Sequence, residues 1–243
     1  MKISELFYSI QGEGKRSGRP SFFIRTNHCN LRCKFPGGNL CDTYYTSWEP
    51  DDERNLGELN FDQIITEYKK INCSDIVITG GEPAMYPSEL SDLCQKLREI
   101  NPESYFTIET NGTYFGEFVK YSDLLSISPK LKSSVPYNTV YEKMHEKNRI
   151  NYETFSKFNQ LKENYLIDIQ WKFVYTTEKD IEEIRQIQSV IGFKDNDIYL
   201  MPEGITAEDL NSKRSETIEV CKKNNFNYTD RLHILAWGNK RGV

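Results

Sequence analysis

Residues 22–43 read Phe22-Phe-Ile-Arg-Thr-Asn-His-Cys29-Asn-Leu-Arg-Cys33-Lys-Phe-Pro-Gly-Gly-Asn-Leu-Cys41-Asp-Thr43, in which an apolar run leads into three closely spaced cysteines. The apolar run predicts a β-strand over 22–26, and the cysteines follow its end. Soft thiolate ligands suit iron–sulfur clusters and zinc. Three thiolates hold three corners of a cubic 4Fe–4S cluster, and the fourth iron then stays open for another ligand. The stretch therefore predicts a metal-binding loop after a strand.

A second motif favours the iron–sulfur cluster over zinc. Thr79-Gly80-Gly81-Glu82-Pro83 follows another apolar run, which predicts a strand over 75–79. Zinc would need a fourth ligand, and His28 beside Cys29 is the available candidate for a Cys₃His site. A zinc site has no use for the Gly-Gly-Glu-Pro turn, whereas an open cluster that works with a second cofactor does. The two motifs together favour the cluster and point to radical chemistry.

Short β-rich runs alternate with helical patterns along the rest of the chain. Strands are predicted over 22–26, 75–79, 105–109, 123–128, 167–174 and 197–201. Helices are predicted over 61–71, with a capping box of Asn60 and Gln63, and around 90–97, 151–164, 181–191 and 206–224. Six strands alternating with helices predict an α/β fold, a partial (βα)₆ barrel similar to a TIM barrel, in a single domain of residues 1–243. The C-terminal strand ends share one rim, and barrel enzymes have their active sites there.

The composition narrows the functional classes. The chain has 243 residues, 37% of them hydrophobic and 13% aromatic, which allows a large core. Its net charge of −5 speaks against binding nucleic acid. No apolar run approaches the roughly 18–20 residues of a membrane span, and the start does not resemble a signal peptide. Six cysteines, three of them within thirteen residues, suit a reduced, cytoplasmic protein better than a disulfide framework.

Taken together, these features resemble the radical S-adenosylmethionine enzymes and, within them, the 7-carboxy-7-deazaguanine synthases. The motifs that carry the narrower resemblance are Phe7-Tyr-Ser-Ile-Gln-Gly-Glu-Gly14, Arg25, Cys41-Asp-Thr43, Ser128-Pro-Lys130 and the C-terminal run from Arg231 to Val243. The usual cysteine spacing of these enzymes is Cys-x3-Cys-x2-Cys, whereas seven residues separate Cys33 from Cys41 here. A turn-rich insertion is expected to loop out from a modified cluster-binding loop without moving its ends far.

The resemblance implies three cofactors. Cys29, Cys33 and Cys41 would hold the 4Fe–4S cluster, S-adenosylmethionine would bind its open iron, and Thr43 would be a ligand of Mg²⁺. The glycines after the second strand would let the backbone approach the methionyl group, and Glu82 would anchor its ammonium. The implied S-adenosylmethionine residues are Gly80, Gly81, Glu82, Ser128, Pro129, Lys130, Gln170, Trp171, Lys172, Phe173, Met201, Pro202 and Glu203.

The resemblance also implies the reaction. A 5′-deoxyadenosyl radical takes hydrogen from C6 of 6-carboxy-5,6,7,8-tetrahydropterin, the ring contracts, ammonia leaves, and 7-carboxy-7-deazaguanine forms, a step of queuosine and deazapurine biosynthesis. Arg25 would pair with the substrate carboxylate. The implied substrate residues are Ile10, Gln11, Gly12, Glu13, Arg25, Thr79, His233 and Val243, and Glu13, Arg25 and Glu109 would take part in catalysis. The structural alternatives are a solvated loop charge for Lys130 and a core histidine for His233.

The family further implies a homodimer and an electron donor of the flavodoxin or ferredoxin type. One alternative is a small radical activase that makes a glycyl radical on a partner protein, but such an enzyme lacks the Gln-Gly-Glu-Gly start. Another is a non-catalytic zinc or iron–sulfur protein, which leaves the Gly-Gly-Glu-Pro and Ser-Pro-Lys motifs without a use. The segment 132–164 carries no motif that suggests a function.

Overall fold

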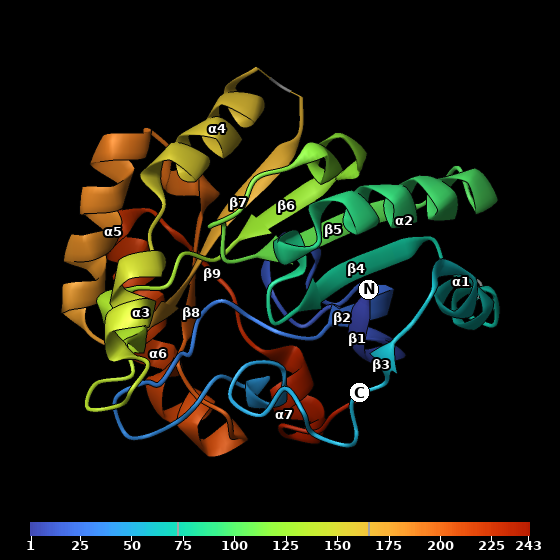
Figure 1. The fold of residues 1–243 in the computed structure, drawn as a ribbon. Helices are drawn as coiled ribbons and strands as arrows, with labels where there is room; N and C mark the ends of the chain where they lie inside the picture. Colours follow the sequence, from blue (N-terminus) through green and yellow to red (C-terminus); the bar gives the residue numbers. More distant parts are fainter. Residues whose placement is uncertain (72, 165) are drawn as a thin grey trace.

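The computed structural model describes residues 1–71, 73–164 and 166–243, and in this part of the chain nine strands form one sheet (Figure 1). The strands are β1 (Lys2–Ile10), β2 (Pro20–Thr26), β3 (Gly57–Glu58), β4 (Asp75–Gly80), β5 (Tyr105–Thr110), β6 (Leu124–Ile127), β7 (Asp168–Tyr175), β8 (Ile198–Pro202) and β9 (Asn227–Tyr228). Their order is β3-β1-β2-β4-β5-β6-β7-β8-β9. A two-residue strand, β3 or β9, therefore lies at each edge of the sheet, and over the described residues the sheet does not close into a barrel.

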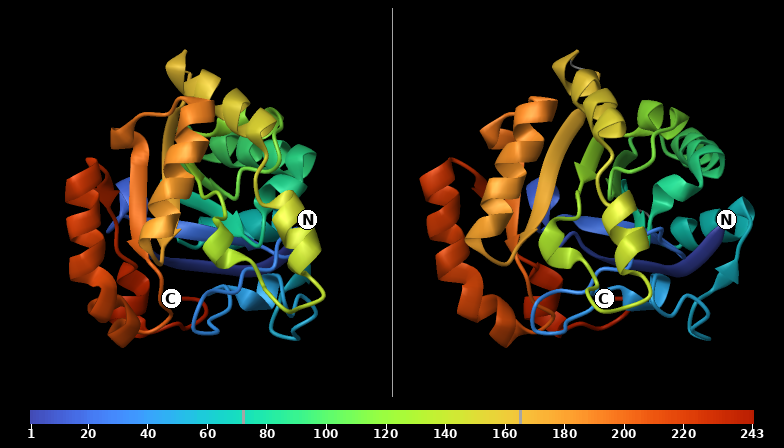
Figure 2. Two further views of the ribbon diagram at one scale, coloured as in Figure 1. Left: turned by 90° about the vertical axis from the view of Figure 1, so that its left-hand side faces the viewer. Right: turned by 60° about the vertical axis from the view of Figure 1, so that its left-hand side comes forward.

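The helices are α1 (Phe61–Lys69), α2 (Pro87–Ile100), α3 (Glu142–Asn148), α4 (Tyr152–Glu163), α5 (Glu178–Ile191), α6 (Ala207–Asn224) and α7 (Leu232–Trp237). Helices α2, α4, α5 and α6 cover the outer face of the curved sheet, which Figure 2 shows from two further sides. The loop after β2, helix α7 and the C-terminal tail gather at one end of the sheet (Figure 1). In the described ranges, no helix has the length and apolar character needed to cross a membrane.

The six predicted strands are confirmed as β2, β4, β5, β6, β7 and β8, and each pairs in parallel with the next. The sequence reading missed β1, which pairs antiparallel with β2 from Ile3 to Ile10. Glu5 and Ser9 interrupt its apolar character, although Glu5 is in fact buried. Strands β3 and β9 span two residues each, too short to leave a pattern in the sequence.

The predicted helices are confirmed as α1, α2, α4, α5 and α6, while the short α3 and α7 were not predicted. Helix α1 ends at Lys69 rather than near residue 71. Its capping box is present, because Gln63 N donates to Asn60 Oδ1 (3.0 Å) and Asn60 N donates to Gln63 Oε1 (2.9 Å). Cys94 is fully buried on the apolar face of α2, as its spacing predicted.

Candidate active site

A cavity of about 180 Å³ lies at the C-terminal ends of the parallel strands. Thr79 and Gly80 reach it from β4, and Glu109 and Thr110 reach it from β5. The residues after β2 and β6, together with the C-terminal tail, complete its wall. The predicted gathering of polar residues at one rim is therefore what the structure shows. The sequence-predicted residues that line the cavity are Ile10, Gln11, Gly12, Glu13, Arg25, Cys29, Cys33, Cys41, Thr43, Thr79, Gly80, Gly81, Glu109, Ser128, Lys130, Lys172, Met201, Glu203, His233 and Val243.

The seven residues between Cys33 and Cys41 form a small hairpin. Lys34 and Leu40 make an antiparallel bridge, and Cys41 N donates to Cys33 O (3.2 Å), so the two cysteines that flank the insertion are brought together. Gly37 and Gly38 at the tip have φ of 94° and 98°, a conformation that favours glycine. Asn39 fastens the hairpin to the rim by donating from Nδ2 to Glu203 Oε1 (2.9 Å). The insertion thus loops out as expected.

All three cysteines are free thiols that line the cavity. Burial raises the pKa of Cys29 to about 12, and burial likewise raises the pKa of Cys33 and of Cys41. Each buried thiol would therefore ionise readily only with a cationic partner such as an iron centre. Thiol groups, burial and a shared cavity fit a cluster held by these three residues.

The spacing of the sulfurs also argues against a zinc ion. Within the described ranges, the one set of three His, Cys, Asp or Glu ligand atoms that lie within 4.8 Å of one another is Glu13, Asp42 and His233. The sulfurs of Cys29, Cys33 and Cys41 therefore do not all lie within 4.8 Å of one another. Ligands at about 2.3 Å from one tetrahedral zinc ion would lie closer together than that. The other proposed zinc ligand, His28, has its Nε2 3.3 Å from Lys2 Nζ.

The Gly-Gly-Glu-Pro turn packs directly against the start of the cysteine loop. Gly81 N donates to Thr26 O (3.1 Å) and Glu82 N donates to His28 O (2.9 Å). A Cβ atom on Gly81 would lie 2.0 Å from the His28 carbonyl oxygen, and one on Gly80 would lie 2.3 Å from Thr26 O. The glycines are therefore required first by this contact between the two motifs.

The Glu82 carboxylate is fully buried and bonded inside the protein. It accepts hydrogen bonds from Ala84 N (2.9 Å), Thr110 Oγ1 (2.6 Å) and Asn111 N (2.6 Å). Burial raises its pKa in spite of these donors. In this arrangement Glu82 connects the turn after β4 to the end of β5, so it shapes the wall of the cavity from behind.

A buried ammonium group joins two of the residues predicted to be catalytic. Lys172 Nζ lies 2.5 Å from Glu13 Oε2 and 3.3 Å from Glu109 Oε1. Gln11 Nε2 and Thr79 Oγ1 also donate to Glu109, at 3.2 Å and 2.8 Å. Burial lowers the pKa of Lys172, but the two carboxylates outweigh that effect and the net shift is upward. The lysine is thus a fixed positive charge between two carboxylates.

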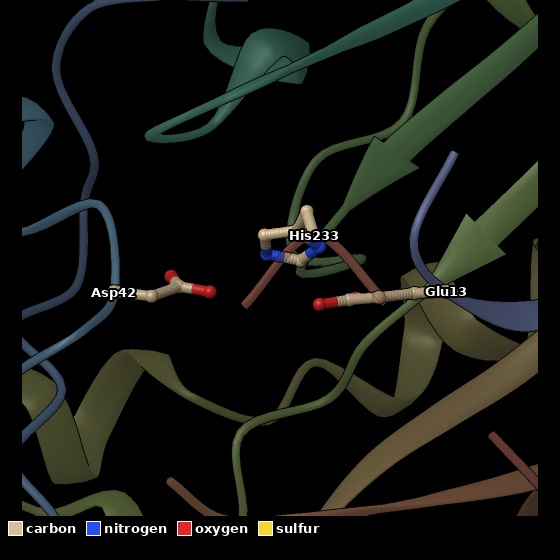
Figure 3. Close-up of side chains that lie close together, drawn as sticks. All are labelled: Glu13, Asp42 and His233. Atoms are coloured by element: carbon tan, nitrogen blue, oxygen red, sulfur yellow. The ribbon is translucent and has the colours of Figure 1, made fainter. Parts of the chain in front are cut away.

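Glu13, Asp42 and His233 point toward a common space in the cavity (Figure 3). Arg231 lies beside both acids, with Nε 3.5 Å from Glu13 Oε1 and Nη2 3.6 Å from Asp42 Oδ2. Burial opposes ionisation of Glu13, yet Lys172 and Arg231 bring its pKa below the usual value, and Arg231 is the largest favourable influence on Asp42, whose pKa is also lowered. Burial lowers the pKa of His233, so a neutral imidazole faces two carboxylates.

Arg25 belongs to a network that reaches the C-terminus. Its Nε donates to Glu5 Oε2 (2.8 Å), which also accepts from the Tyr45 hydroxyl (2.8 Å). The other oxygen of Glu5 accepts from Arg241 Nε (3.0 Å), and the Arg241 guanidinium lies 3.9 Å from the centre of the Tyr45 ring. Arg25 therefore bonds to Glu5 through its Nε, and Arg241, near the end of the chain, bonds to the same carboxylate.

Six residues predicted to bind S-adenosylmethionine are not among the described residues that line the cavity. Trp171 and Phe173 are fully buried on the other side of β7, where Trp171 stacks on Phe193 with ring centres 4.5 Å apart. Gln170 donates from Nε2 to Ser126 Oγ (2.8 Å) and accepts from Lys15 N (2.7 Å). The remaining three are Glu82, Pro129 and Pro202.

The cavity residues that sequence reasoning missed include Asp42, Arg231 and Tyr45, each of which contacts a predicted site residue or its partner. Asp42 and Arg231 stand in the quoted Cys-Asp-Thr and Arg-Leu-His motifs, so their charge and position beside assigned residues were a usable signal. Tyr45 follows the cysteine loop without any motif, and its link to Glu5 depends on the fold.

Comparison with known proteins agrees with this geometry. The radical SAM superfamily matches residues 23–186. The 7-carboxy-7-deazaguanine synthase of Halobacterium salinarum is 38% identical over 251 residues, which cover 98% of this chain and 90% of the relative. That of Rhodopirellula baltica is 36% identical and covers 99% of this chain and 88% of its own. The chain belongs to the 7-carboxy-7-deazaguanine synthase family.

The predicted family and fold class are thereby confirmed. Among solved structures, QueE from Escherichia coli superimposes with a TM-score of 0.65 over 94% of this chain and 92% of its own, at 21% identity. At that identity the similarity supports the fold, an α/β partial barrel with a mostly parallel sheet.

Proposed function

We propose that this chain converts 6-carboxy-5,6,7,8-tetrahydropterin to 7-carboxy-7-deazaguanine by radical S-adenosylmethionine chemistry. The observation that carries the proposal is the convergence, in one cavity, of three free thiols, the two glycines of the Gly-Gly-Glu-Pro turn, and paired carboxylates and cations. Its relatives favour this reaction over activation of a partner protein or a purely structural metal site. One sheet runs from residue 2 to residue 228, which supports a single working domain of residues 1–243.

Cys29, Cys33 and Cys41 would hold the 4Fe–4S cluster. With S-adenosylmethionine bound, the cluster would supply the 5′-deoxyadenosyl radical chemistry that removes hydrogen from C6 of the substrate. The backbone of Gly80 and Gly81 would line the methionyl end. The side chains of Ser128 and Lys130, after β6, and of Met201 and Glu203, at the end of β8, also line the cavity and would complete that end.

The paired carboxylates and cations of the cavity suit the substrate. The pyrimidinone ring of the pterin presents N–H groups, and the carboxylates of Glu13 and Glu109 are acceptors held in place by Lys172. Gln11 supplies a side-chain amide in the same cavity, next to Ile10 and Gly12. A Cβ atom on Gly12 would lie 2.1 Å from His233 Nδ1, so glycine is needed where the loop after β1 meets α7.

Burial and neighbouring charges set the protonation states that these roles require. Lys172 and Arg231 hold Glu13 as a carboxylate by lowering its pKa against the effect of burial. Burial lowers the pKa of His233, whose neutral ring can donate one hydrogen bond and accept another. Arg25 keeps its terminal guanidinium nitrogens for the substrate carboxylate, since only its Nε bonds to Glu5. Thr79 and the terminal carboxylate of Val243 would close this side.

Three partners are further proposals. Thr43 and, beside it, the Asp42 carboxylate offer the oxygen ligands that Mg²⁺ prefers. A flavodoxin or ferredoxin would deliver the electron. We also propose that the enzyme is a homodimer and that it works in the cytoplasm, where its six free thiols stay reduced.

The test is turnover under anaerobic conditions. Reconstituted protein is mixed with S-adenosylmethionine, dithionite, Mg²⁺ and 6-carboxytetrahydropterin, and products are followed by mass spectrometry. We expect 7-carboxy-7-deazaguanine from the wild type, little without Mg²⁺, and none from C41A. 5′-Deoxyadenosine without the deazapurine would retain the radical chemistry and refute the substrate. Neither product from a protein with a full cluster would refute the proposal.

A further inference from the structure

Helix α3, in the segment without a sequence-predicted function, lies beside the cysteine loop (Figures 1 and 2). The ring of Tyr141, just before the helix, packs edge-on against Trp48, with ring centres 5.3 Å apart, and lies 5.3 Å from the Arg32 guanidinium. Lys34 N, in the same loop, donates to Ser134 O (3.0 Å). The cysteine loop is therefore bonded on both sides of Cys33 to the segment that contains α3.

His145 is the buried centre of this contact. Its Nδ1 accepts a hydrogen bond from Arg32 N (3.1 Å), the amide next to Cys33. Ser134 Oγ donates to Leu131 O (2.6 Å), which leaves that hydroxyl oxygen to accept from His145 Nε2 (3.2 Å). Both contacts are satisfied together only by a neutral ring with its hydrogen on Nε2. Burial favours the neutral ring by lowering the pKa of His145 to about 4.

One turn along the chain, Arg149 bonds a second loop of the cavity. Its Nη1 donates to Lys130 O (3.2 Å) and lies 2.5 Å from Glu183 Oε1, while Glu146 accepts from its other nitrogens at 3.0 Å. Lys130 ends the Ser-Pro-Lys motif and lines the cavity. Two buried residues of one short segment thus reach the backbones of both loops.

We propose that α3 is a clasp for the active site, in which His145 is a positioning residue for the cysteine loop and Arg149 is one for the 128–130 loop. By fixing the Arg32 amide, His145 would hold Cys33 in the conformation that binds the cluster. The assignment deepens the proposed function and rests on it for the identity of the bound group. The hydrogen bonds themselves can be tested without that group.

The test compares H145F with H145N and with K143A, an exposed position on the same helix. Phenylalanine fills the space of the ring without the acceptor, whereas the Asn side-chain oxygen takes the place of Nδ1. Amide hydrogen exchange of the cofactor-free protein is measured over residues 29–34 and over β4. For H145F we expect exchange at 29–34 to be faster by about fivefold, which corresponds to one lost hydrogen bond, with β4 unchanged. H145N and K143A should resemble the wild type.

The reconstituted proteins are then challenged with an iron chelator. H145F should lose its iron faster than the wild type and K143A, and H145N should recover most of the difference. Unchanged exchange at 29–34 in H145F, or equal defects in H145N and H145F, would overturn the clasp. If H145F does not fold, S134A replaces it, and unchanged exchange there would have the same meaning. A wild type that binds no cluster would refute the proposed function and leave the exchange result to judge the clasp.

Discussion

Replacing Lys172 with Met should expose how much the cavity depends on its buried ammonium. The lysine is 6% exposed and its partner Glu13 is 11% exposed, so solvent screens this pair weakly. Removing one member of a buried pair costs about 3–5 kcal/mol, because the other charge is left uncompensated. Arg231 still lies 3.5 Å from Glu13 in the variant, so we expect the lower end, about 3 kcal/mol.

The pH dependence of that loss follows from the pKa of Glu13. In the wild type this pKa lies below 4.5, since the nearby cations outweigh burial, so the stabilisation is present above 4.5 and is lost as the pH falls through the folded-state pKa. In K172M burial is opposed only by the weaker cations, and the pKa rises. Protonation then relieves the uncompensated charge, so the difference between the two proteins should shrink as the pH falls through the raised pKa of Glu13 in K172M and on toward the lower pKa of the wild type.

The assay is urea unfolding of the cofactor-free proteins under anaerobic conditions, with E13Q and E13Q/K172M completing a double-mutant cycle. We expect K172M to be more damaging alone than in the E13Q background, by about 2 kcal/mol. K172R, which keeps the charge, is the control. A K172M loss below about 1 kcal/mol, a loss that does not vary with pH, or additive variants would refute the reasoning.

Three further predictions concern other parts of the cavity. G81A should destabilise the protein by about 3 kcal/mol in thermal unfolding, because its Cβ would lie 2.0 Å from a carbonyl oxygen of the cysteine loop, and a change below 1 kcal/mol would contradict that contact. E5Q should raise the KM for the pterin more than it lowers kcat, because it weakens the ion pairs of Glu5 with Arg25 and Arg241. An unchanged KM in steady-state kinetics would show that these ion pairs do not position the substrate. The free energy of unfolding should fall by about 2 kcal/mol between pH 8 and pH 5 because of His145, whose pKa is near 6.5 in the unfolded state and about 4 in the folded state. Urea titrations at the two pH values measure this loss, and H145N should lack it.

Much of the fold could be predicted from the sequence because the parallel strands are short apolar runs followed by polar residues. The run 75–79 illustrates this, since all of its residues are buried and the Gly-Gly-Glu-Pro turn marks its end. Strand β1 escaped prediction because a buried ion pair between Glu5 and Arg25 resembles surface polarity in the sequence. Helix α3 is too short to show a period.

The site was predictable in its motifs and less so in its pairings. Lys172 and Glu13 are 159 positions apart, and only the barrel brings them together. Strand alternation divides the run 170–173, since Gln170 and Lys172 point inward while Trp171 and Phe173 pack toward the helices, and this period of two was available from the sequence.

Whether Cys29, Cys33 and Cys41 hold a cluster with an open iron is tested most directly by the electron paramagnetic resonance spectrum of the reduced, reconstituted protein. We expect a full complement of iron and sulfide, a 4Fe–4S signal that changes when S-adenosylmethionine is added, and loss of the cluster in C29A, C33A and C41A. C73A, which alters a cysteine outside the cavity lining, should keep both signal and response. A signal that does not change when S-adenosylmethionine is added, or a cluster that is still present in C41A, would contradict a cluster with one open iron and these three cysteine ligands.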